Sequence, residues 1–535
     1  MATWNPEPEA SRSKPVAVID IGTNSVRMVI AQMWPDGRLE ELERVERAVA
    51  LGHDTFVTDR LSQQTMNTAI AILRDYRRML DTYGVEAVRA VATSAVREAD
   101  NGDAFVDRVA MAVDIDLEVL ATTEESRLSA SALRVTVGDA LDLGSGRALI
   151  VDVGGGSTLL TVLDGGVITA SVSYAVGSIR LQEYLASTRE PRDRAMELLR
   201  HRIASVVNIV GRTMPLDAVR WLLAVGEDAQ FAAKHAGRPL VGAERVSMVE
   251  QSAFERLVSE CARQTPAQVA SCYGLPLPTA VRLMPALLIY RALLHASSAE
   301  EMVVCSVSMR DGLLLDMARR VTGKEDPELA ESIVRSAKSV GAKYRVDERH
   351  AAQVADLAVR LFDELAAEHG LGPRHRLLLR VAGVLHEVGK FVSNRAHHKH
   401  CYYLIAHAEV YGLSRREIEM VAHVARYHRR SAPKKTHLDY MTLPREDRIA
   451  VSKLASLLRV ADALDRGHQQ HVRELSFQRR PGEFIIYVGG AVDLTLERQA
   501  MAEKADLFEE TFGMRARLEE AAAPLGDGRR ASPVE

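Results

Sequence analysis

Two stretches of the chain share one pattern: an apolar run reaches an aspartate, and a glycine turn and hydroxyl residues follow. The first is VAVIDIGTNS at residues 16–25, and the second is ALIVDVGGGST at residues 148–158. Runs of β-branched and apolar residues are typical of buried strands. In each copy a second apolar stretch continues to an Asp-Gly turn, at residues 36–37 and 164–165. Each copy predicts a β-hairpin, and the repetition indicates two duplicated lobes.

The rest of each lobe alternates between helical and strand periods. In the first lobe we expect helices at 61–83, from Asp103 and at 122–134, with strands at 85–93 and 117–121. In the second we expect helices at 178–185, 191–211 and 310–320, with strands at 221–225 and 302–306. Beyond the Asp326-Pro327 boundary we expect helices at 349–370, 374–390, 415–430 and 450–464, strands around a Pro-Gly turn within 474–496, and a last helix at 499–512.

These patterns divide the chain into segments of different character. We expect a disordered tail at 1–14, an α/β lobe at 15–142, a second α/β lobe at 143–324, a helical domain at 325–470, a small α+β cap at 471–522 and a second tail at 523–535.

Composition narrows the class of protein. The chain is 47% hydrophobic and 26% charged, which fits several folded domains. Its four cysteines show neither CxxC spacing nor the framework of a secreted protein, so we expect a reducing, cytoplasmic setting. We find no apolar stretch long enough to span a bilayer, and the first 14 residues lack the apolar core of a signal peptide.

Charge and histidine are distributed unevenly. The net charge of −4 argues against specific nucleic-acid binding, yet residues 395–437 hold nine Arg or Lys against three Glu. Thirteen of the 17 histidines lie between His350 and His471. The basic stretch is typical either of a groove that follows a long polyanion or of an ordinary solvated face, and the sequence leaves both open.

The glycine turns have the composition of a phosphate site. Glycines leave backbone amides open to a ligand, successive amides form a concave anion site, and hydroxyls add donors. Asp152, at the end of the second strand, could hold a divalent cation against the phosphate. The candidate phosphate-binding residues are Gly22, Thr23, Asn24 and Ser25 in the first turn and Gly154, Gly155, Gly156, Ser157 and Thr158 in the second.

A family resemblance rests on six motifs in order: IDIGTNSVRMVI, ATSAVR, TTEESRL, VDVGGGST, AVGSIRL and MRDGLL. Together they resemble the exopolyphosphatase / guanosine pentaphosphate phosphohydrolase family, which belongs to the actin, heat-shock-chaperone and sugar-kinase superfold. VLHEVGK and ARYHRR resemble the C-terminal domain of long members, which is related to HD phosphohydrolases. The resemblance implies an α/β fold with two duplicated actin-like (ribonuclease H-like) lobes, an all-α HD-like domain and a small α+β cap.

The same resemblance implies an activity and roles for single residues. It implies hydrolysis of the terminal phosphoanhydride of inorganic polyphosphate between the lobes, assisted by Mg²⁺, with guanosine pentaphosphate as the alternative substrate. Asp20 and Asp152 match the magnesium side of the site, and Arg97 matches the phosphate-contacting arginine. Glu125 matches the catalytic base, a role suited to a carboxylate that orients water.

Two departures from the family pattern bear on that activity. Leu159 stands where the family has a glutamate, which removes one oxygen ligand for magnesium. Glu227 and Asp228 replace a small turn near the distal phosphate, where two acids would repel a polyanion or form a relocated magnesium site. The alternative is therefore a weakened enzyme that acts as a polyphosphate- or alarmone-binding regulator.

The helical domain carries its own candidate metal site. The resemblance places His350, His386, Glu387 and Asp462 where HD enzymes hold a divalent metal, and His423 and His428 could complete it. Glu387 in place of aspartate lengthens one ligand, so a degenerate HD fold with packed histidines stays an alternative, as does an HD-type metal phosphohydrolase. Large helical domains often pair, so a homodimer is one expected assembly.

Overall fold

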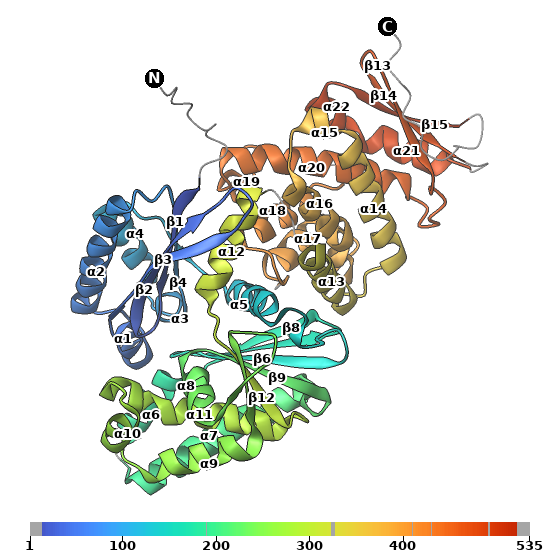
Figure 1. Ribbon diagram of the computed structural model, residues 1–535. Helices are drawn as coiled ribbons and strands as arrows, with labels where there is room; N and C mark the ends of the chain where they lie inside the picture. The colour runs from blue at the N-terminus through green and yellow to red at the C-terminus, as the bar shows by residue number, and fades with distance from the viewer. Residues whose placement is uncertain are drawn as a thin grey trace, which may run out of the picture. The chain divides into compact units, whose positions relative to one another are not determined.

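The computed structural model describes residues 13–188, 190–322, 327–408, 410–429, 431–489 and 493–521. The chain divides into two compact units, Met1–Lys324 (unit 1) and Glu325–Glu535 (unit 2), and each is described by itself (Figure 1). The predicted tails at 1–14 and 523–535 lie outside the described residues, except that Ser13 is described and Lys14 begins the first strand.

Lobe I of unit 1 is built on a five-stranded sheet with the order β3-β2-β1-β4-β5. β1 pairs antiparallel with β2 and parallel with β4. Strands and helices pack their apolar faces into one core that includes Ile19, Met28, Leu73 and Phe105. The elements are β1 (Lys14–Ile21), β2 (Ser25–Met33), β3 (Leu39–Ala48), α1 (Leu51–Thr58), α2 (Gln63–Thr82), β4 (Ala87–Ala92), α3 (Ser94–Arg97), α4 (Gly102–Val113) and β5 (Leu117–Val119).

Lobe II repeats this order within a larger sheet. Its seven strands run β10-β11-β12-β9-β6-β7-β8, so the five strands β8-β7-β6-β9-β12 match lobe I one for one. β6 pairs antiparallel with β7 and parallel with β9, as β1 does with β2 and β4. The predicted duplication is confirmed. The strands are β6 (Arg147–Val153), β7 (Thr158–Asp164), β8 (Val167–Tyr174), β9 (Val219–Val225), β10 (Arg238–Pro239), β11 (Val246–Glu250) and β12 (Glu301–Cys305).

Helices cover both faces of these sheets. α5 (Thr122–Val137) and α12 (Met309–Thr322) lie side by side, and Leu128 and Leu313 pack with Val18 of β1 (Figure 1). Because α12 packs on lobe I although it follows the strands of lobe II, the chain crosses back between the lobes. The other helices of lobe II are α6 (Ser178–Thr188), α7 (Arg192–Thr213), α8 (Glu227–Ala236), α9 (Gln251–Arg263), α10 (Pro266–Tyr273) and α11 (Leu277–Ala296), and the short 3₁₀ segments are η2 (Gly138–Ala140) and η3 (Leu216–Ala218).

The expectation that no stretch is long and apolar enough to span a membrane is wrong for one helix. By length and composition alone, α11 is apolar enough to cross a membrane, and we expected no such stretch. In the structure it is a core helix of lobe II, and buried residues such as Leu287 and Tyr290 pack with Phe254 of α9.

Unit 2 is helical and ends in a three-stranded sheet of order β13-β14-β15. A single core joins the helices to this sheet, from Leu361 to Phe484 and Phe508. The predicted last helix is two helices, and a strand follows them that the pattern did not predict. The elements are α13 (Pro327–Lys343), α14 (Glu348–Glu364), α15 (Ala366–His369), α16 (Pro373–Leu385), η4 (Val388–Phe391), α17 (His397–Ala406), α18 (Arg415–Arg426), α19 (Leu438–Met441), α20 (Arg445–Leu464), β13 (Leu475–Arg480), β14 (Glu483–Val488), α21 (Thr495–Lys504), α22 (Asp506–Phe512) and β15 (Arg515–Glu520).

Candidate functional site

The two glycine turns have the same backbone hydrogen bond. Gly22 N donates to Ser25 O at 3.0 Å, and Gly154 N donates to Ser157 O at 2.9 Å. Each turn follows the first strand of its lobe, so Asp20 near the end of β1 and Asp152 near the end of β6 occupy equivalent positions. The duplication therefore extends from the sheets to the details of the candidate site.

The two turns also approach each other at the junction of the lobes. A Cβ built on Gly155 would lie 2.9 Å from the Thr23 Cβ, and one on Gly156 would lie 2.8 Å from the Ser94 Oγ. Real Cβ atoms essentially never show such distances, so a side chain at Gly155 would push against Thr23, and one at Gly156 would displace the ends of the Ser94 and Phe56 side chains. Arg180 of lobe II supports it by donating to the Gly156 carbonyl at 2.7 Å.

Glu125 lies near the start of α5, where it pairs with Arg97. Arg97 also donates to the Leu120 carbonyl at 2.6 Å, which fixes the guanidinium beside the carboxylate. Burial raises the pKa of Glu125 to about 7 against the opposing charge of Arg97, and the charges of Asp152 and Asp20 add to the rise. Three predicted site residues, Glu125, Asp152 and Asp20, are thus close enough to act on one another.

Asp152 and Asp20 form the second part of this carboxylate cluster. Burial raises the pKa of Asp152 to about 6, although Ser129 donates to it at 3.4 Å, and Asp20 contributes to the rise. Arg310 Nη1 approaches Asp20 Oδ2 at 3.7 Å. Two carboxylates that raise the energy of each other's charged form gain from a divalent cation between them, and carboxylate oxygens suit Mg²⁺. The pair therefore fits the expected metal.

The neighbouring glutamate has a different role. Glu124 is 4% exposed and pairs with Arg127 at 2.8 Å and with Arg89 at 3.4 Å. Asp316 of α12 joins the same two arginines, so this network ties α5 to α12. Of the two adjacent glutamates, Glu125 alone faces the carboxylate cluster among the described contacts. α5 begins after Ala121, its N-cap, which makes no side-chain cap bond.

The hydroxyl groups of the turns are not all available to a ligand. Thr158 Oγ1 donates to the Val176 carbonyl, so its proton is already used within lobe II. Ser25 is 3% exposed, and its hydroxyl hydrogen bonds to Glu46. Thr23 Oγ1 lies 3.4 Å from Ser94 Oγ. The backbone amides are therefore the main donors that the turns can offer to an anion.

Leu159 lies directly across the hairpin from Asp152. The β6–β7 register pairs Asp152 with Leu159, whose side chain is 7% exposed. The equivalent register in lobe I pairs Asp20 with Arg27. The residue opposite Asp152 is therefore apolar where the family has a glutamate. The residue opposite Asp20 is positively charged.

Glu227 and Asp228, which we expected either to repel a polyanion or to form a relocated magnesium site, have different partners. Glu227 accepts from Arg27 of lobe I and from Arg282 of lobe II, each at 2.6 Å. Asp228 is 4% exposed, and burial raises its pKa to about 6. The charge of Glu227 is thus compensated by one arginine from each lobe, whereas burial and the charge of Glu227 raise the pKa of Asp228.

The predicted metal residues of the helical domain also converge. His350 Nε2 lies 3.6 Å from Asp462 Oδ1, and His386 Nε2 lies 3.8 Å from the same oxygen. Within the described part of the chain, neither Nε2 atom has a hydrogen-bond partner. Nitrogen and oxygen donors in this arrangement suit a borderline divalent metal. This buried group could bind a metal ion.

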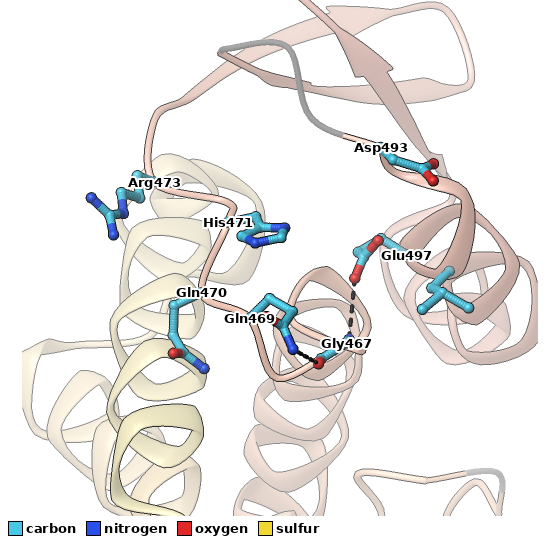
Figure 2. A pocket seen from close by; sticks show the side chains of 8 residues that line it. Gly467, Gln469, Gln470, His471, Arg473, Asp493 and Glu497 are labelled. Carbon is cyan, nitrogen blue, oxygen red and sulfur yellow. Dashed lines mark hydrogen bonds between the residues drawn. The ribbon is translucent and has the colours of Figure 1, made fainter.

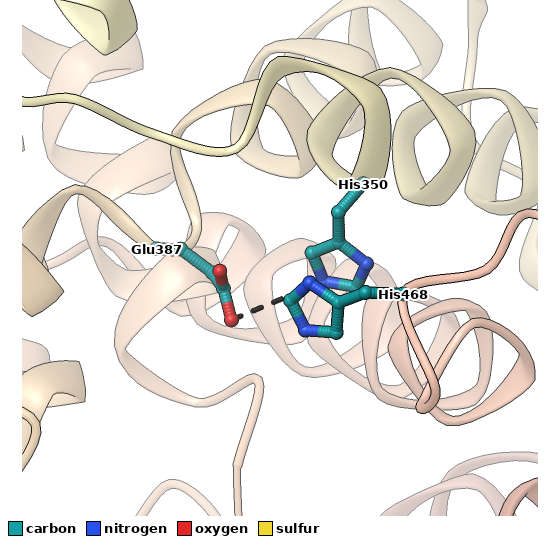
Figure 3. A group of neighbouring side chains, drawn as sticks. All are labelled: His350, Glu387 and His468. Atoms are coloured by element: carbon teal, nitrogen blue, oxygen red, sulfur yellow. Dashed lines mark ion pairs between the residues drawn. The ribbon is translucent and has the colours of Figure 1, made fainter.

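Glu387 and His468 form an overlapping group with His350 (Figure 3). Glu387 Oε1 lies 3.9 Å from His350 Nε2, and the His468 ring stacks on His350 with centroids 3.6 Å apart. Burial would lower the pKa of His350, but the carboxylates of Asp462 and Asp465 outweigh it and raise the pKa to about 9. A positive charge, whether a proton or a metal ion, is therefore favoured at this point.

One predicted ligand is wrong. His423 does not join the group, because its ring packs between Tyr402 and Tyr440, with centroids 4.7 and 5.7 Å away. His428 does approach the group, but it lies beyond the end of α18. The apolar spacing of α18 did not distinguish the buried aromatic face from the face toward the metal residues.

Some of the basic residues at 395–437 act on His398. Burial lowers the pKa of His398 to about 4, and the charges of His397, Arg429, Lys399 and Arg426 act in the same direction. Arg426 is paired with Asp439 at 3.3 Å. Arg430 lies outside the described residues.

A cavity of about 530 Å³ borders the loop that carries His468 (Figure 2). Gly467 N donates to Glu497 Oε1 at 3.2 Å across one side of it. Gln470 N donates to Asp465 Oδ1 at 2.8 Å, and Asp465 Oδ2 lies 2.8 Å from His350 Nδ1. The same aspartate therefore positions both the cavity loop and His350.

Several residues of these sites escaped the sequence analysis. Arg310 and Arg27 belong to the carboxylate cluster, and His468, Asp465 and Lys504 belong to the metal residues. Asp465 follows Asp462 by three positions at the end of the same helix, which is a signal that the sequence contained. Lys504 comes from a helix 42 positions away and left no local signal.

Comparisons with known proteins agree with this architecture. A model described as the Ppx/GppA phosphatase family matches residues 29–321, and one described as Ppx/GppA phosphatase, domain III, matches residues 334–500. A guanosine-5'-triphosphate,3'-diphosphate pyrophosphatase of Photobacterium profundum is 24% identical over 448 residues, covering 83% of this chain and 84% of that protein. A protein of the same name from Vibrio campbellii is 25% identical over 425 residues, covering 79% and 82%.

Among solved structures, an exopolyphosphatase from Cytophaga hutchinsonii is 22% identical and has a TM-score of 0.51, covering 57% of this chain and 98% of that one. This likeness confirms the two-lobe α/β fold. With both family models matched along most of its length, the chain belongs to the Ppx/GppA phosphatase family.

Proposed function

We propose that unit 1 hydrolyses the terminal phosphoanhydride of inorganic polyphosphate and releases orthophosphate. One observation carries the proposal: beside two equivalent glycine turns, the charge of Asp20 raises the pKa of both Asp152 and Glu125, so the three carboxylates lie close together. Such a set supplies a base, a place for a cation and amide donors for phosphate, which are the parts that phosphoryl transfer needs.

In this mechanism Glu125 accepts a proton from the attacking water. The water oxygen forms a bond to the terminal phosphorus as the bond to the leaving phosphate breaks, and the leaving chain takes the electron pair. Arg97 keeps the Glu125 carboxylate oriented, because it is itself held by the Leu120 carbonyl. A carboxylate with a raised pKa is a stronger base than an ordinary glutamate, which favours proton transfer at neutral pH.

Other residues bind the polyanion. The amides of the two turns would hold the terminal phosphates, and Arg310 would offset the charge that develops. Arg310 is suited to this because its Nε and Nη1 are buried without a hydrogen-bond partner in the described structure. Asp20 and Asp152 would hold Mg²⁺, which supplies electrostatic stabilisation of the phosphoryl oxygens when bound.

Guanosine pentaphosphate is the second candidate substrate. The relatives named guanosine-5'-triphosphate,3'-diphosphate pyrophosphatases match most of the chain, whereas the exopolyphosphatase structure covers 57% of it and is alike in fold. Charge compensation at Glu227 removes the repulsion that would have disfavoured a terminal phosphate near this turn. Assays with both substrates, at equal concentrations of terminal phosphate, distinguish the two.

The weakened-enzyme alternative rests on Leu159, which gives Asp152 an apolar neighbour in place of an oxygen ligand. It predicts that either substrate binds with little orthophosphate release at saturating Mg²⁺. Efficient turnover of either substrate at saturating Mg²⁺ would reject it.

The test of the mechanism is the Glu125→Gln variant of the full-length protein. We expect orthophosphate release to fall by about 10²–10⁴-fold with substrate binding largely retained, because the amide cannot accept the proton. Glu118→Gln, a change at the exposed end of β5, is the matched control and should keep the wild-type rate. An undiminished rate in Glu125→Gln would remove Glu125 from the mechanism.

A further inference from the structure

The motif AVGSIRL, at residues 175–181, takes no part in the mechanism proposed above, although it lies against the second glycine turn. Its last four residues begin α6. Ser178 N donates to the Gly154 carbonyl at 2.9 Å. Ile179 N donates to the Gly155 carbonyl, also at 2.9 Å. The first two carbonyls of the turn are therefore bound by backbone amides at the start of one helix.

Arg180 adds the third carbonyl of the turn to this set. Its backbone amide donates to the Gly155 carbonyl at 3.0 Å, and its side-chain Nε donates to the Gly156 carbonyl at 2.7 Å. The peptide group is planar and trans, so its carbonyl and its N–H point in opposite directions. Carbonyls that face α6 therefore turn the amides of Gly155, Gly156 and Ser157 away from the helix. Among the described contacts these three amides donate to no other group, which leaves them open to an anion.

The far end of the Arg180 side chain reaches lobe I. Its Nη2 pairs with Glu98, which follows Arg97 directly at the end of α3. The guanidinium carbon lies 3.9 Å from the centroid of the Phe56 ring in α1. One side chain of lobe II therefore joins the glycine turn to the segment of lobe I that carries Arg97.

We propose that Arg180 is a positioning residue for the hydrolysis in unit 1. It holds the amides of the second glycine turn toward the phosphate and fixes them relative to Arg97. Arg180 acts through the turn and not on the substrate, because its guanidinium is engaged by the Gly156 carbonyl, Glu98 and the Phe56 ring. This role rests on the proposed function, since it requires that phosphate binds at the turn.

The contacts of Arg180 need the shape of a guanidinium and not only its charge. Nε and Nη2 belong to one planar group and donate in fixed directions, Nε to the turn of lobe II and Nη2 to Glu98 of lobe I. A lysine ammonium keeps the charge, but it has neither the fixed fork of donors nor a planar face to stack on Phe56. Lysine at position 180 should therefore preserve the local charge and release the turn.

The test compares Arg180→Lys and Arg180→Ala in the full-length protein, with tripolyphosphate and Mg²⁺ as the probe. We expect both variants to lower kcat/KM for orthophosphate release about 10–100-fold and to raise KM about tenfold, because hydrogen bonds from the amides to a charged phosphate are weakened. The midpoint of thermal unfolding should stay within about 3 °C of the wild type. Arg194→Ala is the control, since Arg194 is exposed in α7 and pairs only with Glu197 among the described ion pairs.

Two outcomes of this comparison would overturn the proposal. A wild-type kcat/KM in Arg180→Lys would mean that positive charge alone is sufficient. A lower kcat with unchanged KM would indicate a merely structural role, since loss of folded protein reduces the number of active sites without changing their affinity.

Glu98 distinguishes positioning from a direct contact between Arg180 and phosphate. Glu98→Ala should also lower kcat/KM, because it frees one end of the arginine. The double variant Glu98→Ala/Arg180→Ala should be as active as Arg180→Ala within about twofold, since both changes break the same chain of contacts. An arginine that bound phosphate directly would not need Glu98. A Glu98→Ala variant that keeps or exceeds the wild-type rate, or whose loss adds in full to that of Arg180→Ala, would therefore contradict the assignment.

Calorimetric binding of tripolyphosphate separates this role from the proposed function. It is measured in the Glu125→Gln background, where the probe is not consumed, and Arg180→Lys should raise the Kd about tenfold there. Binding without orthophosphate release by the wild type would reject the proposed function, and the rise in Kd would still support the role of Arg180. Normal release by the wild type with an unchanged Kd and KM in Arg180→Lys would reject the role of Arg180 alone. A wild type that neither bound nor hydrolysed the probe would reject both.

Discussion

Buried carboxylates in unit 1 fall into two kinds that differ in their partners. Glu124 is surrounded by Arg89 and Arg127, which compensate its charge within the protein. Among the described contacts, Asp152 accepts a side-chain hydrogen bond only from Ser129, and burial raises its pKa to about 6. A carboxylate that the protein itself does not neutralise is typical of a site that receives a cation or a proton during function. Whether arginines neutralise a buried carboxylate therefore distinguishes the structural acids from the candidate functional ones.

Asp228 gives a pH-dependent prediction. Its pKa in the folded protein is about 6 against an ordinary value of 3.8, so folding favours the protonated form. The stability that this provides is complete below about pH 4 and is lost as the pH rises through about 6. We expect Asp228→Asn to raise the free energy of unfolding at pH 8 by up to about 3 kcal/mol, and by little at pH 4.

Denaturant unfolding at the two pH values measures this difference. Asp107→Asn, at an exposed position of α4, is the control and should show no comparable pH dependence. A gain for Asp228→Asn that is equal at pH 4 and pH 8 would rule out titration of this carboxyl as the cause.

The sequence predicted much of the carboxylate cluster because its residues carry local patterns. Asp20 and Asp152 end apolar strands, and the duplication placed them together without knowledge of any contact. Glu125 needed the family resemblance, since a first-turn glutamate is otherwise an ordinary helix residue. The contacts of Arg310 with Asp20 and of Glu227 with Arg27 could not be assigned from sequence, because they depend on how the two lobes pack.

At the scale of elements, the predicted strands and helices that have a clear apolar period were found with boundaries shifted by a few residues. β3 was missed because it is an edge strand whose residues are mostly charged and exposed, which hides the alternation. β15 was missed because it is a short strand in which only Ala516 and Leu518 are buried. A strand that buries only a few apolar side chains, against a partner distant in the sequence, has a weak hydrophobic pattern of its own.

The second glycine turn yields a prediction about a single element. A Cβ on Gly177, at the start of α6, would lie 2.3 Å from the Gly155 carbonyl oxygen, and the atoms that it meets are backbone. We expect Gly177→Ala to lower the free energy of unfolding by about 1–3 kcal/mol and to reduce orthophosphate release by displacing the turn. Thermal unfolding and the phosphate assay measure the two effects.

Gly211 provides the matched control for this substitution. It lies within α7, and a Cβ there meets nothing within 4 Å. Gly211→Ala should therefore raise stability by about 0.5–1 kcal/mol, since alanine is the better helix former, and should leave the turn unchanged. If Gly177→Ala and Gly211→Ala were equally stable and active, the close approach of Gly177 to Gly155 would not restrict position 177 to glycine.

At the scale of the whole molecule, two units with separate hydrophobic cores carry two candidate sites of different chemistry. Unit 1 presents oxygen ligands and amide donors, which suit magnesium and phosphate. Unit 2 presents imidazole nitrogens. The carbonyl oxygens of Gly383 and Ala425 accept hydrogen bonds from the Nδ1 atoms of His386 and His428, which leaves each Nε2 atom with its lone pair. The uneven distribution of histidine along the chain, visible from the sequence, thus corresponds to a division of ligand type between the units.

This division predicts two separable unfolding transitions in the calorimetry of the full-length protein. Ligands stabilise only the cooperative unit that binds them, by about 2.7 kcal/mol at 100 times the dissociation constant. In excess Mg²⁺, which would fill the carboxylate site of unit 1, added Mn²⁺ should therefore raise the midpoint of one transition, and Gly177→Ala should lower the midpoint of the other. Because the hydrophobic core of each unit consists of that unit's own residues, neither change should shift the midpoint of the other unit's transition. Parallel shifts of both midpoints, from Mn²⁺ or from the variant, would mean that the two units unfold as one.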